Sequence, residues 1–421
     1  MKYYLSLVLL NININIIYSY IKLPFKTYNS DDINYFYNNF LYINLNIGLP
    51  QQNNSKIVLK QGRYNFFLYD NTIYSSASYN SKSSTRFHTL VDDIFELTSS
   101  NCLKGISSMD TFFIQSQRFD NITFILCTKS KNNEYELFDG EIGLNLEYQS
   151  PPNSNFISIL KNNEVINNYI YSINYINDNE GFLLIGEYPH KINSEYKAYN
   201  LNWIHSEISK NNFHWTVLFD KISYGNGDIY QAQREARLLN EIKYIISTGQ
   251  YYNLFKDIFG SKCSIIHIDL DEDLQGFKCN KNINKELTPE IRFYNKALNM
   301  TFVLDYNDLY IEKGDYLYFL VAKYFEYQPE YWVLGKPFMK KYLFLFNYDS
   351  KMIGFYKSND KDNDKHSNKN NYFSISIILN IVLIVIVIIL VFIFCQYYLK
   401  KRRIRANELE DKFNYTAKED K

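Results

Sequence analysis

The sequence predicts an all-β protein with two lobes, followed by a single C-terminal transmembrane helix. Between about Tyr35 and Tyr356, short apolar runs alternate with polar turns, a pattern typical of many short strands. The 421 residues include 40 Tyr and 31 Phe, and aromatic residues favour strands over helices. A chain of this length exceeds one ordinary hydrophobic core, which indicates two lobes. Only short stretches, such as Gln231 to Asn240 and Tyr251 to Phe259, are typical of helices.

The N-terminus has the pattern of a secretory signal peptide. Lys2 precedes a short apolar run from Tyr3 to Leu10. A charged start followed by a short apolar segment is typical of such signals. We therefore predict a signal peptide over residues 1–20.

The C-terminal region predicts a type I membrane anchor. Residues 372–398 contain Ile, Leu and Val runs without charge and are long enough to cross a bilayer as a helix. Basic residues from Lys400 onward place the tail, residues 399–421, in the cytosol. The polar residues 358–371 predict a flexible stalk. The chain is thus expected to be a single-pass protein of the secretory or endolysosomal route or the cell surface.

Composition argues against several classes of partner and cofactor. Lys plus Arg and Asp plus Glu number 45 each, so no bulk charge favours nucleic acid. The six His are scattered without metal-ligand spacing, and no Gly-rich phosphate loop leads from a strand into a helix. We expect no metal, no cofactor and no nucleic acid.

The cysteines indicate an oxidising compartment. Four precede the predicted membrane span, two in each half of the chain: Cys102, Cys127, Cys263 and Cys279. Three pairings are possible, and we prefer the local ones, Cys102–Cys127 and Cys263–Cys279. Asn-X-Ser/Thr triplets predict N-glycosylation at Asn53, Asn121 and Asn299, although such triplets are frequent by chance in an Asn-rich chain.

Two tight Gly turns, almost two hundred residues apart, each follow an apolar strand. The first runs Ile57-Val58-Leu59-Lys60-Gln61-Gly62-Arg63-Tyr64. The second runs Tyr244-Ile245-Ile246-Ser247-Thr248-Gly249-Gln250. With the strands that close each half of the chain, they indicate a twofold repeat.

Further landmarks follow in a fixed order and resemble the pepsin-like aspartic proteases (peptidase A1). They include Ile47-Gly48-Leu49-Pro50, Phe138-Asp139-Gly140-Glu141-Ile142-Gly143-Leu144, Trp332-Val333-Leu334-Gly335 and Ile353-Gly354-Phe355. The resemblance covers roughly three quarters of the chain, and the order of its motifs makes it specific. It implies an N-terminal lobe over residues 31–199, a C-terminal lobe over residues 200–357 and a peptide-binding cleft between them.

The resemblance also shows what the chain lacks. In the family each Gly turn reads Asp-Thr-Gly, and two close carboxyls share a proton and activate a water molecule. Here Lys60 and Ser247 take the two Asp positions. Without either acid, that mechanism has neither its base nor its acid. The chain is therefore expected to have no catalytic residue of the family type.

The loss extends to the residues around the two turns. Gly62, Thr248 and Gly249 keep the family pattern, whereas Gln61, Arg63 and Tyr64 replace hydroxyl residues that support the acids. Thr98 stands where the family's flap carries a Tyr. The expected cleft residues are Lys60, Gly62, Arg63, Tyr64, Thr98, Ser247, Thr248 and Gly249.

Three classes of function remain open. A non-catalytic homologue would bind an extended peptide in the cleft without cutting it. An active aspartic endopeptidase is what the family itself implies, and a purely structural surface protein is the third class. A Lys60–Ser247 dyad is chemically conceivable, but the sequence provides no oxyanion hole. Lys60 with Arg63 would favour an acidic ligand, unless a nearby carboxylate pairs with Lys60.

Overall fold

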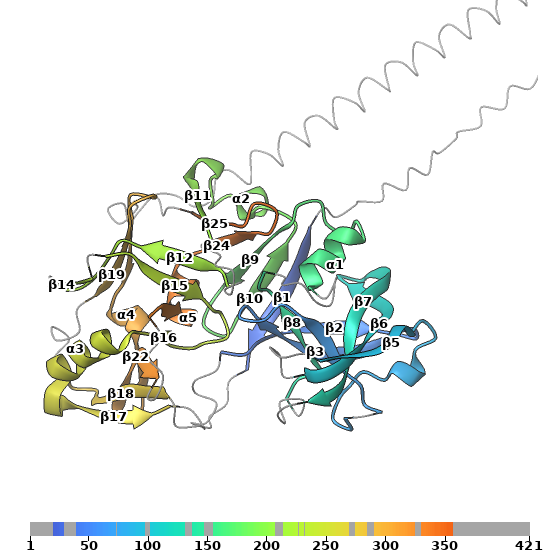
Figure 1. The fold of residues 1–421 in the computed structure, drawn as a ribbon, viewed down its shortest axis with the longest axis horizontal. Helices are drawn as coiled ribbons and strands as arrows, with labels where there is room; N and C mark the ends of the chain where they lie inside the picture. Colours follow the sequence, from blue (N-terminus) through green and yellow to red (C-terminus); the bar gives the residue numbers. More distant parts are fainter. Residues whose placement is uncertain are drawn as a thin grey trace, which may run out of the picture. The chain divides into compact units, whose positions relative to one another are not determined.

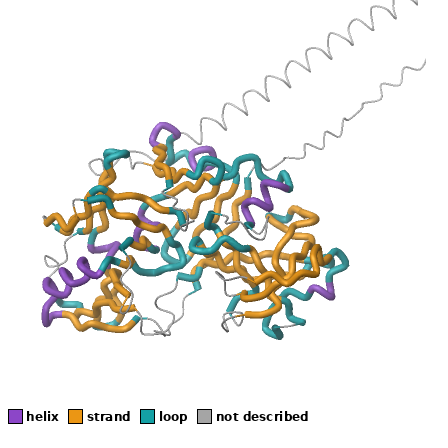
Figure 2. Tube along the Cα trace, viewed as in Figure 1, coloured by secondary structure: helices purple, strands orange, loops and turns teal. Residues whose placement is uncertain are grey.

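The computed structural model describes most of the residues between the predicted signal peptide and the predicted stalk. It describes residues 20–28, 39–72, 74–96, 102–130, 137–146, 155–206, 214–225, 227–230, 232–268, 274–283, 290–324 and 330–356. Strands dominate these residues and helices are few (Figure 2). The prediction of a mostly β fold is confirmed. The signal peptide, stalk, membrane span and tail lie outside the described residues.

The largest sheet among the described residues has thirteen strands. Its order is β11 (Leu201–His205), β25 (Met352–Tyr356), β24 (Phe344–Asn347), β9 (Ile170–Tyr175), β10 (Glu180–Ile185), β1 (Ile21–Thr27), β2 (Leu41–Ile47), β3 (Gln52–Lys60), β8 (Gly140–Gly143), β4 (Phe66–Tyr69), β7 (Gln117–Ser130), β6 (Cys102–Ile114) and β5 (His88–Glu96). Strands from the beginning and from the end of the described residues therefore share one sheet. Figure 1 shows how its strands lie side by side, for example β9, β10 and β1.

Two smaller sheets are built from residues 216–334. The eight-stranded one runs β12 (Thr216–Phe219), β15 (Arg234–Leu238), β23 (Trp332–Leu334), β16 (Ile245–Ile246), β22 (Tyr316–Tyr324), β18 (Leu274–Asn280) and β17 (Cys263–His267), with β21 (Tyr310–Lys313) also paired to β22. The four-stranded one runs β14 (Gly227–Tyr230), β13 (Lys221–Tyr224), β19 (Ile291–Asn295) and β20 (Met300–Leu304).

The helices of the described residues are short. They are α1 (Phe156–Asn162), α2 (Pro189–Ile192), α3 (Gly249–Phe259), α4 (Tyr306–Leu309) and α5 (Lys336–Lys341). Asn155 caps α1, because its side chain accepts hydrogen bonds from the backbone N–H groups of Ile157 and Ser158. Helix α3 confirms the prediction for Tyr251 to Phe259 and buries an aromatic stripe of Tyr251, Tyr252, Phe255 and Phe259.

The helix predicted over Gln231 to Asn240 is wrong. Residues 234–238 form β15 between β12 and β23. Ala236 and Leu238 are fully buried, whereas Arg237 between them is only partly buried, which is the period of a strand. Ala, Arg and Leu are good helix formers, and pairing with two neighbouring strands overrides that preference.

Strand β1 begins before residue 31, where the first lobe was expected to start. Ile21, Leu23 and Phe25 are buried and alternate with exposed residues. The strand pairs with β10 on one side and β2 on the other. This alternation is the signature of a strand with one face in the core.

Aromatic rings fill the cores beneath both halves of the β-structure. In the first half, Phe66 contacts Phe112 and Phe156 at ring-centroid distances of 5.7 and 5.0 Å. In the second half, Phe293 contacts Trp332 and Phe338 at 5.5 and 5.7 Å. Edge-to-face pairs at such distances add to the hydrophobic gain of burial. The high Tyr and Phe content is thus partly a structural requirement.

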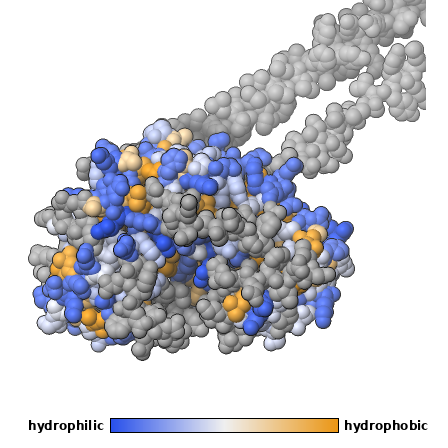
Figure 3. All heavy atoms as spheres, in the orientation of Figure 1, coloured by the Kyte–Doolittle hydropathy of each residue, from blue (hydrophilic) through white to orange (hydrophobic). Residues whose placement is uncertain are grey.

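On the face shown in Figure 3, the described residues are mostly hydrophilic, with small separate hydrophobic areas. Large hydrophobic side chains that are exposed among the described residues lie far apart in the sequence, for example Ile176, Tyr199 and Tyr316. Scattered exposed apolar residues are ordinary on a protein surface. No described helix is long and apolar enough to cross a membrane.

We predict that Gly335→Ala destabilises the fold by about 1–3 kcal/mol. A Cβ at Gly335 would lie 2.2 Å from the carbonyl oxygen of Tyr244 and 2.3 Å from that of Ile242, so the backbone would have to move. Urea unfolding measures the loss.

The matched control is Gly227→Ala, whose Cβ would meet nothing closer than 3.6 Å. It should stay within about 0.5 kcal/mol of the parent. Equal stability of the two variants would contradict the close contact at Gly335.

Candidate functional site

Lys60 is the last residue of β3. Strands β3, β8 and β4 lie side by side, with β8 in the middle. Strands β3 and β8 run parallel, with Lys60 opposite Gly143. The chain then turns back, and β4 lies antiparallel on the other side of β8, with Phe66 opposite Ile142. Gly143 lies directly against this turn, because a Cβ there would be 2.4 Å from the carbonyl carbon of Tyr64. The turn is therefore held against β8.

The second half repeats this arrangement around β23. Strand β15 is parallel to β23, with Leu238 opposite Leu334. Strand β16 is antiparallel to β23 on the other side, with Ile245 also opposite Leu334. Gly335, like Gly143, lies against the intervening turn. Both middle strands thus end in a Gly that packs under a turn.

These registers identify the counterpart of Lys60. Phe66 and Ile245 hold matching positions, each opposite the residue before the packed Gly. Lys60 lies six residues before Phe66, and Leu239 lies six residues before Ile245. The counterpart of Lys60-Gln61-Gly62 is therefore Leu239-Asn240-Glu241.

This register corrects the sequence-based pairing of Lys60 with Ser247. Ser247 lies after β16, where its backbone N–H and its hydroxyl both donate to the carbonyl of Ala322, at 2.8 and 3.2 Å. Thr248 and Gly249 lead into α3, with Thr248 at the N-cap. The apolar run before Ser247-Thr248-Gly249 resembles the family turn in sequence. Strand pairing shows instead that the turn between β15 and β16 is the one that lies against β23.

The two matching turns, Lys60-Gln61-Gly62 and Leu239-Asn240-Glu241, contact each other through Asn240. Its side-chain oxygen accepts a hydrogen bond from the backbone N–H of Gln61 at 2.9 Å, and its side-chain nitrogen donates to the carbonyl of Leu59 at 3.1 Å. Asn240 is fully buried. One amide side chain thus satisfies a donor and an acceptor of the first turn.

Glu241 binds the same turn with its carboxylate. One oxygen accepts from the backbone N–H of Gly62 at 2.7 Å and the other from Gln61 at 3.0 Å. A Cβ at Gly62 would lie 2.3 Å from the carboxylate, so the space left by Gly62 admits it. Burial raises the pKa of Glu241, and the two backbone donors and Lys60 oppose that rise.

Asn39 supports this contact and was not predicted from the sequence. Its backbone N–H donates to the carbonyl of Glu241 at 2.8 Å, and its side chain donates to the carbonyl of Asn240 at 2.7 Å. The sequence signal for this contact is weak, because Asn240, Glu241 and Lys243 all interrupt the apolar residues between Leu238 and Ile246.

Lys60 forms an ion pair with Glu141. Its ammonium lies 3.2 Å from the carboxylate, and the side chains are 10% and 2% exposed. Glu141 is opposite Val58 on the parallel strand, two positions before Lys60. A buried charge needs a partner, and this one neutralises Lys60. The preference for an acidic ligand that Lys60 and Arg63 would give is therefore weakened.

Arg63, Tyr64 and His214 lie around the first turn. Arg63 and Tyr64 are partly buried, and the carbonyl of Arg63 accepts from the N–H of Asn145 at 2.7 Å. The Asn145 amide also lies 3.0 Å from Nδ1 of His214. Burial lowers the pKa of His214 to about 4, and the nearby positive charges of Arg237 and Arg63 lower it further. Thr98 lies outside the described residues.

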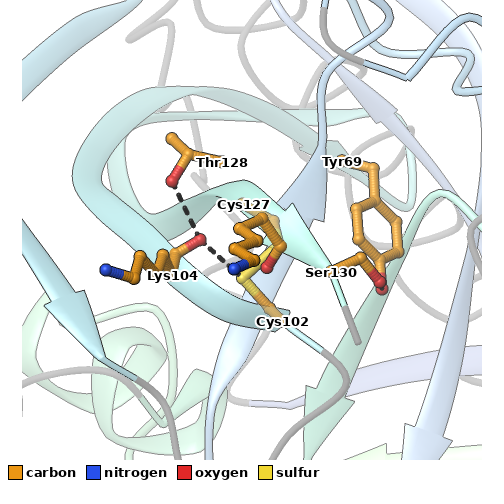
Figure 4. The surroundings of a disulfide bond; sticks show 7 residues. Tyr69, Cys102, Lys104, Cys127, Thr128 and Ser130 are labelled. Carbon is orange, nitrogen blue, oxygen red and sulfur yellow. Dashed lines mark hydrogen bonds between the residues drawn. A yellow bond between two sulfur atoms is a disulfide. The ribbon is translucent and has the colours of Figure 1, made fainter. Parts of the chain in front are cut away.

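The predicted local disulfides are both present. Cys102 pairs with Cys127, joining β6 to β7, and Cys263 pairs with Cys279, joining β17 to β18. Figure 4 shows the first, beside the hydrogen bond of 3.0 Å from the Thr128 hydroxyl to the carbonyl of Lys104. Two disulfides fit a protein of the secretory pathway or the cell exterior.

The remaining predicted sites stay predictions. Asn121 and Asn299 are exposed, while the side chain of Asn53 lies outside what the structure describes. Within the described residues, no group of three or more His, Cys, Asp or Glu side chains is arranged to hold a metal ion.

Comparison with protein families identifies the family of the chain. The model of the eukaryotic aspartyl protease family matches residues 40–358, well over half of the chain. The chain belongs to this family. A search of curated proteins found no individual protein that matches it.

We predict that Asn240→Ala lowers the free energy of unfolding by about 1–3 kcal/mol, because it leaves the buried carbonyl of Leu59 without its donor. Urea unfolding tests this. The exposed Asn253 on α3 supplies the control, since Asn253→Ala should change stability by less than about 0.5 kcal/mol. Similar losses in both variants would argue against a specific role for Asn240.

We predict a loss of stability in mild acid that depends on His214. Its pKa is about 4 in the fold and ordinarily 6.5, so the unfolded chain binds more protons between these values. Stability from neutral His214 is complete above pH 6.5 and is lost as the pH falls toward 4.

The wild type should therefore lose about 2–3 kcal/mol more than His214→Gln over this interval. Urea unfolding at several pH values measures the difference. Parallel pH profiles for the two proteins would show that His214 does not titrate in this way.

Proposed function

We propose that this chain is a membrane-anchored, non-catalytic homologue of the aspartyl proteases that binds extended peptides between its two lobes. The observation that carries the proposal is the identity of the paired turn residues. Lys60 and Leu239 hold the matching positions, and neither side chain has a carboxyl group. The protease mechanism activates water with two carboxyls that share a proton. Lys60 and Leu239 can supply neither of these carboxyls.

The nearby carboxylates do not replace the missing pair. Glu141 is bound to the ammonium of Lys60, and Glu241 is bound to the N–H groups of Gln61 and Gly62. Each carboxylate is occupied by a different partner, whereas the protease mechanism needs two that face each other across one water molecule. The contacts of Ser247 with Ala322 likewise give no support to a Lys60–Ser247 dyad.

Peptide binding is proposed because the scaffold of the family is retained. Members of this fold bind substrate as an extended strand between the lobes, and such binding uses main-chain hydrogen bonds that need no catalytic acid. Since Glu141 neutralises Lys60, we propose a ligand without a marked acidic character. The two lobes would divide near residue 200, with β1 belonging to the first.

The anchor and the route through the cell belong to the same proposal. The uncharged residues 372–398 with the basic residues behind them favour a single C-terminal span, and the apolar N-terminus favours a signal peptide. The two disulfides support passage through an oxidising compartment.

The alternative function is that of an active aspartic endopeptidase, as family membership implies. Digestion of a peptide library by the purified full chain separates the two functions. We predict no cleavage by the wild type at acid or neutral pH, and saturable binding of uncleaved peptides. Cleavage by the wild type that a transition-state mimic of the family inhibits would overturn the proposal.

A pair of variants sharpens this experiment. Lys60→Asp/Leu239→Asp places two acids at the positions that strand pairing makes equivalent, whereas Lys60→Asp/Ser247→Asp places the second acid beyond β16. Activity gained by the first variant alone would show an intact scaffold whose acids are lost. A structural surface protein predicts neither peptide binding nor cleavage in the wild type.

A further inference from the structure

The hairpin between β19 and β20 carries the Asn-X-Thr triplet Asn299-Met300-Thr301. Asn295 pairs with Met300 at the base of its turn, and the backbone N–H of Asn299 donates to the carbonyl of Lys296 at 3.1 Å. Asn299 is exposed and has a φ of 46°. Asn adopts this left-handed conformation more readily than most residues with a side chain. The triplet therefore lies at an accessible and tightly defined turn.

The side chains of the triplet belong to the outer face of the four-stranded sheet. Tyr294 and Thr301 lie directly opposite each other on β19 and β20, and side chains of such a pair stand on the same face. The neighbouring pair, Phe293 and Phe302, is buried on the other face. The Tyr294 hydroxyl donates to Oδ1 of Asn299 at 3.5 Å. This contact uses Oδ1 and does not involve Nδ2, the atom to which an N-linked glycan is joined.

A cavity of about 640 Å³ opens on this outer face. We call it the hairpin cavity, and its lining includes Ser223 of β13, Arg292 and Tyr294 of β19, Thr301 and Val303 of β20, and Glu290. Its volume falls within the range of about 300–1,000 Å³ that is typical of sites for small ligands. Since Asn299 contacts Tyr294, a group attached to Asn299 begins next to this cavity.

The lining of the hairpin cavity combines an aromatic ring with many hydrogen-bonding groups. Arg292 forms an ion pair with Glu290, yet the two side chains stay 47% and 31% exposed and can contact a ligand. Ser223 and Thr301 add hydroxyls, which both donate and accept hydrogen bonds. A pyranose ring has C–H groups on its faces and hydroxyls around its edge, so it can stack on a Tyr ring and hydrogen-bond to the polar groups. An apolar peptide segment would leave these polar groups without partners, which is costly.

We propose that Asn299 carries an N-linked glycan whose first N-acetylglucosamine residues lie in the hairpin cavity against Tyr294. In the transfer, a bond forms between Nδ2 of Asn299 and the anomeric carbon of the sugar. The bond from that carbon to the pyrophosphate of a lipid-linked donor breaks, and Nδ2 loses one proton. The proposal rests on the secretory route in the proposed function and is independent of peptide binding.

The exposed Asn121 of β7 provides a comparison within the same chain. Its triplet, Asn121-Ile122-Thr123, also matches the acceptor pattern, but none of its residues lines the hairpin cavity. A glycan on Asn121 therefore reports how fast a sugar chain outside this cavity is released.

Release of the glycans by peptide-N-glycosidase F tests the proposal. Full chain purified from eukaryotic secretory cells is digested in heavy-oxygen water, which marks each released Asn by mass. We expect Asn299 to be glycosylated and its glycan to leave the native chain about 10-fold more slowly than a glycan on Asn121, because a docked sugar must first leave the cavity. Denaturation should remove the difference.

Substitutions in the cavity separate a docked glycan from a free one. Tyr294→Ala should speed release at Asn299 toward the rate of the denatured chain, whereas Tyr294→Phe keeps the ring and should release slowly. Arg292→Gln changes an exposed side chain and tests the cavity if Tyr294→Ala folds poorly. Arg86→Gln, at another exposed arginine, is the matched control and should release like the wild type.

The outcomes also separate this proposal from the secretory route. Thr301→Val should abolish the glycan on Asn299, and Thr301→Ser should keep it. A glycan on Asn121 with none on Asn299 would overturn this proposal alone, and the absence of glycans from both would also contradict the secretory route. Release at Asn299 that is equally fast in the wild type and in every cavity variant would overturn the docking of the glycan.

Discussion

The contact between the two turns depends on two backbone N–H groups, those of Gln61 and Gly62. A tight turn leaves such groups without strand partners, and buried N–H groups must be hydrogen-bonded. Asn240 and Glu241 supply the acceptors from the matching turn almost two hundred residues away. Asn39 holds these two residues through their own backbone carbonyls. The geometry of the centre therefore rests on polar contacts that join distant parts of the chain.

The same centre shows how a lysine is accommodated where β3 ends at the first turn. Lys60 is nearly buried, and an unpaired charge there would be costly. Glu141, on the neighbouring parallel strand, lies within reach and pairs with it. A buried ion pair adds little net stability, but removing one partner alone is strongly destabilising. Lys60 and Glu141 therefore depend on each other, which is a structural explanation for two charged residues in an apolar setting.

The second turn differs from the first in the residues that hold the matching positions. Leu239 is an apolar residue, and the Gly position that follows holds Glu241. Glu241 directs its carboxylate toward the first turn, where Gly62 leaves room for it. Gly62 thus serves here to admit a side chain from the other turn. This use of the Gly is specific to the pairing of these two turns.

Sequence reasoning was sound where the signal was local or covered a long stretch. The order of the motifs indicated the family, which the comparison confirmed. The spacing of the cysteines favoured the local disulfides, and the stretch at Tyr251 to Phe259 predicted a helix that α3 contains. Sequence reasoning failed at residues 231–240, where good helix formers lie in a strand. It also failed at Ser247, because the Gly turn there resembles in sequence the turn that the strand pairing identifies at Leu239. Thr98 and the predicted membrane span lie outside the described residues.

The sequence by itself thus determined the family, the mostly β fold and the absence of an acid at Lys60, because these follow from residue types and their order. Only the tertiary structure decided that Leu239 is the positional counterpart of Lys60 and that Glu141 neutralises Lys60. It also decided that Asn240 and Glu241 hold the first turn. The physical reason is that a parallel register and a hydrogen bond between distant turns depend on which strands pair. Two similar Gly turns give the same local pattern, and the position of β23 between β15 and β16 distinguishes them.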